Sequence, residues 1–152
     1  MHSKTTLNYV TSYRDLEVYR RQRTLSREVF QLSKSFPKEE RYSLTDQIRR
    51  ASRAIGAQIA EAWAKRLYPK HFVSKLTDAD GEQLETQHWL TEASDCAYID
   101  EGESRRLLGL CQEIGRMLGS MIQKANSFSS TDYRIHEDSP PYLVEETSDW
   151  EH

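Results

Sequence analysis

Apolar residues recur at steps of three and four along four long stretches of the chain, and this spacing constrains the fold more than any other feature. In the second stretch the series is Leu44, Ile48, Ala51, Ile55, Ile59 and Ala62. Such steps place side chains on one face of an α-helix. The pattern predicts helices over about 14–35, 43–66, 69–97 and 101–125. The 152 residues include only six Gly and four Pro, which also favours helices over a turn-rich β fold.

The ends of the predicted helices carry residues that start or stop helices. Three pairs have the spacing of N-capping motifs, namely Ser12 with Asp15, Ser43 with Asp46, and Asp100 with Glu103. Pro37 ends the first helix, because proline disfavours the helical conformation in the residue before it. Pro69 suits the first turn of the third helix. Four amphipathic helices joined by short loops predict an all-α fold, an antiparallel up-down four-helix bundle.

The periodic pattern defines one folded region with a segment on each side. We assign residues 1–12 to an N-terminal extension, 13–126 to the bundle and 127–152 to a C-terminal tail. The tail has seven acidic residues and one basic residue, and its composition is typical of disordered segments. It nevertheless contains apolar residues that could dock on the bundle, and the best candidates are Tyr133, Tyr142, Leu143 and Trp150.

The net charge of −3 conceals a strong asymmetry. Residues 1–70 carry 15 Lys or Arg against seven Asp or Glu, whereas residues 71–126 carry five against ten. A basic half can attract a polyanion or pair with the acidic parts of its own chain. The nucleic-acid-binding hypothesis rests on Arg20, Arg21, Arg23, Arg49, Arg50, Arg53, Lys65 and Arg66. The alternative is that these side chains form a solvated surface or salt bridges within the bundle.

Surplus apolar and small residues predict self-association. The second predicted helix is rich in Ala and also contains Gly56, and the fourth has a broader apolar face than one partner helix requires. Unused apolar surface marks interfaces. The candidate interface residues are Ala54, Gly56, Ala57, Leu108, Leu110, Met117 and Gly119.

Signals for catalysis, metals and membranes are weak. The five histidines are scattered without helical spacing, so we expect no metal site, no cofactor and no catalytic residues. Cys96 and Cys111 make no disulfide framework and fit small core residues. The chain has no run of about 18 apolar residues that could span a membrane. It also starts without an apolar signal segment, so a cytoplasmic location is expected.

Several motifs in this order resemble a known family. They are YRDLEVY at 13–19, FPKEERYSL at 36–44, QIRRA at 47–51 and IAEA at 59–62. Together they are similar to the small proteins encoded in intervening sequences of bacterial 23S rRNA genes, over about residues 13–125. The resemblance implies an antiparallel four-helix bundle that assembles into a homopentameric ring. It also implies kinship with the accessory protein of diversity-generating retroelements, a basic pentamer that works with a reverse transcriptase and nucleic acid.

The sequence departs from the family pattern at three places. Gln58 stands where Asn is usual, Ala62 and Trp63 follow where Gly is usual, and Gln22 replaces a small residue.

These features together predict a non-enzymatic scaffold that assembles with itself. Its basic first half would bind RNA or a nucleic-acid-processing protein. One alternative is a helical ribonuclease, because Arg66 and His71 resemble the Arg and His of all-helical RNA-cleaving domains, although Pro69 lies between them. Another alternative is an adaptor that recruits a different protein through its C-terminal tail.

Overall fold

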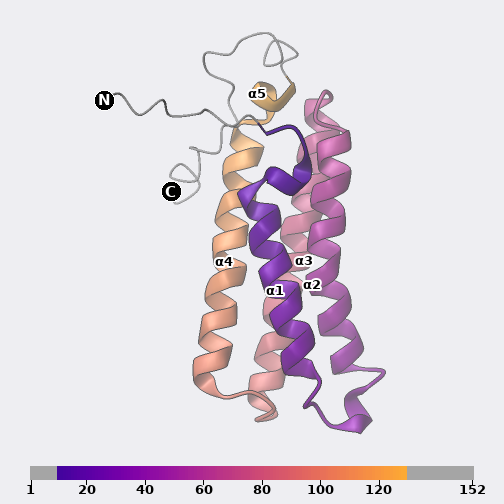
Figure 1. Cartoon of the computed structure of the whole chain (residues 1–152), viewed down its shortest axis with the longest axis vertical. Coiled ribbons are helices and arrows are strands. Elements are labelled where there is room, and N and C mark those ends of the chain that lie inside the picture. Colours follow the sequence, from indigo (N-terminus) through magenta and orange to yellow (C-terminus); the bar gives the residue numbers. More distant parts are fainter. Residues whose placement is uncertain (1–9, 130–152) are drawn as a thin grey trace, which may run out of the picture.

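The structure is a computed structural model that describes residues 10–129. In this part of the chain there are four long helices and no strand, which confirms the predicted all-helical class (Figure 1). The long helices are α1 (Glu17–Ser33), α2 (Leu44–Ala64), α3 (Pro69–Asp95) and α4 (Glu101–Gln123). Shorter elements are the 3₁₀ helices η1 (Tyr13–Asp15) and η2 (Lys38–Glu40), and α5 (Ala125–Ser129).

The four long helices lie side by side along the length of the molecule (Figure 1). α1 packs against α2 and α4, and α3 packs against the same two helices. Each long helix therefore has two neighbours, and its apolar stripe faces the centre. None of the helices described is long and apolar enough to cross a membrane.

The core consists mainly of side chains that the periodic pattern selected. Fully buried examples from each long helix are Leu25, Ile55, Leu76 and Ile114. Burial of each such side chain contributes roughly 1.5–3 kcal/mol. The core also includes Cys111, and its burial raises the pKa of the thiol to about 12. Cys96 is exposed at the end of α3, so the expectation that both cysteines are core residues is wrong for Cys96.

The packed part of the chain extends beyond residues 13–126 on both sides. Val10 and Phe128 are buried, although the sequence pattern assigns them to the extension and the tail. The Phe128 ring lies 5.1 Å from the ring of Phe72, because α5 packs against α3. A cut that removes only the tail must therefore come after Ser129.

The predicted helix ends are confirmed in part. The Asp100 carboxylate accepts a 2.7 Å hydrogen bond from the Glu103 amide, and Pro69 is in the first turn of α3. The other two predicted caps are not confirmed as hydrogen-bonded caps of the long helices. Ser12 caps η1 instead of α1, because Leu16 is buried in an extended conformation that separates the two helices. Ser43 is the N-cap residue of α2, as predicted, but its side chain makes no capping hydrogen bond.

Two buried glutamines lie opposite glycines on neighbouring helices. A Cβ atom on Gly56 of α2 would lie 2.5 Å from Gln22 Oε1 of α1, and one on Gly115 of α4 would lie 2.8 Å from Gln83 Nε2 of α3. Gln22 Nε2 donates a 3.0 Å hydrogen bond to the Ser52 carbonyl. A larger residue at either position would therefore displace the glutamine side chain that lies between the helices.

Candidate nucleic-acid interface

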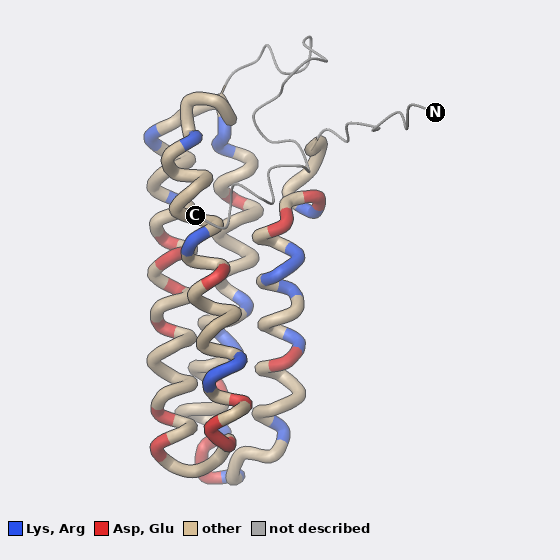
Figure 2. The backbone as a smooth tube through the Cα atoms, turned by 90° about the vertical axis from the view of Figure 1, so that its left-hand side faces the viewer, with Lys and Arg blue, Asp and Glu red and all other residues tan. Residues whose placement is uncertain are grey.

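Charge is divided between the helices of the bundle. α3 contains six acidic side chains, which are Asp78, Asp80, Glu82, Glu85, Glu92 and Asp95. α1 contains four arginines and two glutamates. Figure 2 shows mostly Lys and Arg along α1 and a row of Asp and Glu along α3 on the other side of the view. The basic helix α1 therefore lies away from the acidic residues of α3, whereas α2 packs directly against α3.

Arg21 and Arg50 are held by carboxylates on neighbouring helices. Arg21 pairs with Glu17 at 3.0 Å and with Glu113 of α4. Hydrogen bonding to Glu17 raises the pKa of its guanidinium. Arg50 pairs with Glu82 at 3.4 Å and with Glu85, both on α3, and hydrogen bonding to Glu85 raises its pKa. These two arginines connect helices of the bundle, which favours the salt-bridge interpretation for them.

Three cations gather around one aromatic ring where α1 and α2 meet. The charged groups of Arg49, Lys34 and Arg53 lie 4.7, 4.9 and 5.4 Å from the centre of the Phe30 ring. Within residues 10–129 none of the three forms an ion pair with a carboxylate. A cation–π contact contributes only about 0.5–1 kcal/mol at exposed sites. Three cations without a carboxylate partner on one surface can together bind an anion.

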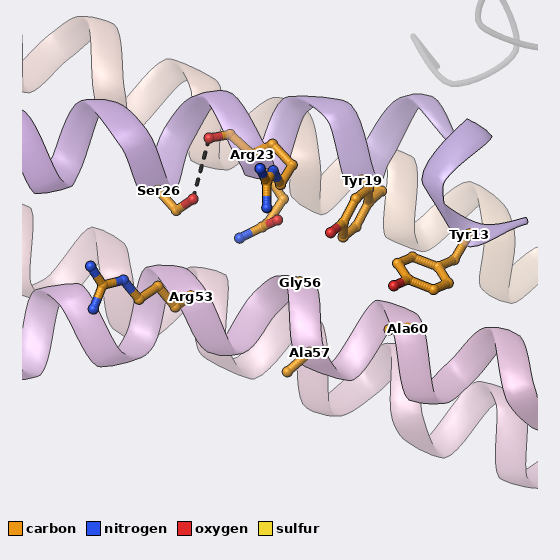
Figure 3. A pocket seen from close by; sticks show the side chains of 9 residues that line it. Tyr13, Tyr19, Arg23, Ser26, Arg53, Gly56, Ala57 and Ala60 are labelled. Atoms are coloured by element: carbon orange, nitrogen blue, oxygen red, sulfur yellow. Dashed lines mark hydrogen bonds between the residues drawn. The ribbon is translucent and has the colours of Figure 1, made fainter.

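An open hollow of about 260 Å³ lies beside this cluster, between α1 and α2 (Figure 3). Its lining residues are Tyr13, Tyr19, Gln22, Arg23, Ser26, Arg53, Gly56, Ala57 and Ala60. The two tyrosine rings meet edge to face at 4.9 Å. Ser26 Oγ donates to the Arg23 carbonyl at 3.2 Å. No acidic residue lines the hollow, so its charged groups are all positive.

We define the basic patch as Arg23, Arg27, Lys34, Arg49 and Arg53. On α1 the patch residues and Phe30 follow one another at steps of four, three and four, so they lie on one helix face. Arg49 Nε also donates to Ser33 Oγ at 2.7 Å, which fixes that side chain between the helices. Sequence reasoning selected Arg23, Arg49 and Arg53 but missed Arg27, Lys34 and Phe30. The helical spacing on α1 was the signal that could have found them.

The remaining predicted cations lie apart from the hollow's lining. Arg20 is exposed and lies 3.7 Å from Glu17, and Lys65 is exposed just after α2. Arg66 lies over the Trp63 ring at 4.4 Å and donates to the Trp63 carbonyl at 3.0 Å. His71 is exposed, with its ring edge-on to Tyr68 at 6.1 Å. Among the residues described, no three His, Cys, Asp or Glu side chains are placed to hold a metal ion.

The predicted interface residues differ in exposure. Gly56 is covered by Gln22, and Met117 is only 2% exposed, so both are covered within a single chain. The partly or fully exposed members are Ala54, Ala57, Leu108, Leu110 and Gly119. Sequence reasoning missed Leu84 on α3, which is 55% exposed. The candidate docking residues of the tail, which are Tyr133, Tyr142, Leu143 and Trp150, lie outside the residues described.

Comparison with known families identifies the chain. A model of the 23S rRNA-intervening sequence protein family matches residues 14–120, from η1 into α4. In a comparison with curated proteins, none matches. The matched stretch contains the whole basic patch and covers more than half of the 152 residues. The chain belongs to the 23S rRNA-intervening sequence protein family.

Proposed function

We propose that this chain is a non-enzymatic scaffold, an antiparallel up-down bundle that assembles with itself and binds RNA through the basic patch. The observation that carries the proposal is the concentration of unneutralised charge at the α1–α2 contact. Arg49, Arg53 and Lys34 surround Phe30 without a carboxylate partner among residues 10–129, whereas Arg21 and Arg50 have such partners. Phosphate binding requires several cations on one surface, because each contact releases counterions.

RNA binding is tested directly by a salt titration of the full chain. Fluorescence anisotropy with a short labelled single-stranded RNA should give an affinity that falls as salt rises. The slope of log affinity against log salt should change by about 0.7 for each phosphate contact. An affinity that does not depend on salt would show that the basic patch does not hold phosphate.

Self-assembly is the second part of the proposal, and the pentamer is its specific form. Leu84 is 55% exposed, and Leu108 and Leu110 pack against the core but remain partly exposed. Burial of these apolar side chains at a contact between two copies would stabilise the assembly. The family resemblance favours five copies arranged in a ring. It also favours kinship with the accessory protein of diversity-generating retroelements, and therefore a reverse transcriptase as a partner protein.

We expect light scattering to give a mass of about 89 kDa, which is five times the 17.8 kDa of one chain. The measurement should be made at micromolar concentration on the full chain. Replacement of Leu84 by Lys should reduce this mass if α3 forms part of the interface, because a charge would then be buried. A mass of 17.8 kDa for the unmodified chain would contradict self-assembly.

The third part of the proposal is that the acidic tail competes with RNA for the basic patch. Residues 130–152 contain seven acidic residues and one basic residue, and they are covalently tethered to the basic bundle. A tethered segment has a high effective concentration at a nearby surface. The tail would occupy part of the basic patch and limit non-specific binding.

Removal of residues 130–152 is expected to raise the RNA affinity at low salt by about threefold to tenfold, because an internal competitor is lost. The gain should shrink as salt rises, since surface charges are screened. Ending the chain after Ser129 keeps Phe128 in the core. A matched control replaces the seven acidic residues by Asn or Gln in the full-length chain. An affinity that stays the same or falls in both variants would rule out the competition.

A further inference from the structure

We infer that the hollow between α1 and α2 binds an unpaired base of a single-stranded nucleic acid, while the basic patch holds the neighbouring phosphates. This inference rests on the proposed function and adds the form of nucleic acid that is bound. Figure 3 shows the rings of Tyr13 and Tyr19 extending into the space between the helices, with Arg23 and Arg53 further along it. Aromatic and cationic side chains therefore line a single hollow.

The size of the hollow favours a small planar group. Its volume of about 260 Å³ lies below the range of roughly 300–1,000 Å³ that is typical of pockets for larger ligands. On α2 it is lined by Gly56, Ala57 and Ala60, whose small side chains let a ring approach the helix backbone. Gln22 is only 3% exposed and is held by Ser52, so it forms a fixed part of the lining.

The chemistry of the lining favours a base with its phosphates over other anions. A tyrosine ring can stack on any base, and an arginine can stack on the base or pair with a phosphate. Arg23 and Arg53 lie in the lining itself, and Lys34 and Arg49 continue the positive charge past Phe30. A simple inorganic anion would use the cations but not the two aromatic rings.

A duplex cannot use the hollow in this way. Bases in a duplex are stacked on one another and paired, so their faces are not available to side chains. Single strands can turn a base outward and stack it on an aromatic ring, which contributes binding energy without requiring a particular sequence. The inference therefore predicts a preference for single strands that phosphate contacts alone would not give.

The test compares strands that share phosphates but differ in their bases. Anisotropy is measured for the full-length chain with a single-stranded RNA, an abasic strand of equal length, the same RNA as a duplex, and single-stranded DNA of the same sequence. We expect the base-bearing RNA to bind about tenfold more tightly than the abasic strand, from the typical strength of stacking on one aromatic residue. Equal binding of RNA and DNA would show that the protein recognises only the base and the phosphates. Tighter binding of RNA would show that the protein also contacts the 2′-hydroxyl.

Tyrosine variants assign this preference to the hollow. Tyr13→Leu and Tyr19→Leu keep an apolar side chain but remove the ring. Each should weaken binding of the base-bearing RNA about tenfold and leave binding of the abasic strand within about twofold. The matched control is Tyr42→Leu, because Tyr42 is 83% exposed and lies outside the hollow. Circular dichroism confirms that each variant is folded.

Failure of the inference can be distinguished from failure of the proposed function. If wild-type protein binds base-bearing and abasic strands equally, or binds the duplex more tightly, the hollow does not receive a base. Loss of binding to both strands in Arg53→Gln would then still support phosphate binding by the basic patch. If the wild-type chain binds none of these nucleic acids, both the inference and the proposed function are overturned. The comparison of strands needs no variant, so it holds even if a tyrosine variant fails to fold.

Discussion

Replacement of Arg23, Arg49 and Arg53 together by Gln is expected to weaken binding of single-stranded RNA by about 100-fold at about 0.1 M salt. Each phosphate contact changes the slope of log affinity against log salt by about 0.7, so three lost contacts should flatten the slope by about 2. Neither Arg49 nor Arg53 forms an ion pair with a described carboxylate, and Arg23 lines the hollow. The fold should therefore survive the change. Anisotropy across a range of salt concentrations measures both effects.

The matched control is the pair Arg21→Gln and Arg50→Gln, which also removes arginine charges from α1 and α2. Both side chains are already paired with carboxylates on α4 and α3. Their loss should leave RNA affinity within about threefold, since long-range attraction is screened by salt. It should lower the melting temperature, because the ion pairs between helices each contribute up to about 1 kcal/mol. If the control loses as much affinity as the triple variant, binding reflects total charge and not the basic patch.

Phe128→Ala is expected to lower the free energy of unfolding by about 3–5 kcal/mol, the typical cost of removing a buried aromatic ring. Phe128 is fully buried and packs against Phe72, which is fully buried as well. Removal of the ring would leave a cavity between α5 and α3. Urea unfolding followed by circular dichroism gives the free energy.

Tyr42→Ala is the control for this experiment, because its ring is 83% exposed. It should change the free energy of unfolding by less than about 0.5 kcal/mol. A cost for Phe128→Ala no larger than that of the control would mean that the packed core ends before α5. The bundle would then match the boundary drawn from the sequence at residue 126.

The positions of the long helices could be predicted because they depend on local periodicity. The predicted helix over 43–66 corresponds to α2 at Leu44–Ala64, and the others agree to within a few residues. Val10 and Phe128 were missed because each is an isolated apolar residue in a segment without a repeating pattern. The cap at Ser12 was wrong because burial of Leu16 interrupts the helix.

The division of the arginines could not be predicted, since it depends on residues distant in the sequence. Arg21 and Glu113 are 92 positions apart, and Arg50 and Glu85 are 35 positions apart. Only the packing of α1 on α4 and of α2 on α3 brings these partners together. The separate packing of α1 on α2 brings Phe30, and Lys34 at the end of α1, next to Arg49 and Arg53 of α2. Net charge along the sequence indicated a basic half but not which of its cations lack partners.

The central claim, that RNA lies on the α1–α2 contact, is tested most directly by photo-crosslinking of the unmodified full chain to RNA. Mass spectrometry of the digested complex then identifies the peptides attached to RNA. We predict crosslinks in peptides that contain Tyr13, Tyr19 or Phe30, which lie in or beside the hollow and the basic patch. Crosslinks confined to α3, for example at the half-buried Trp89, would contradict this account of the chain.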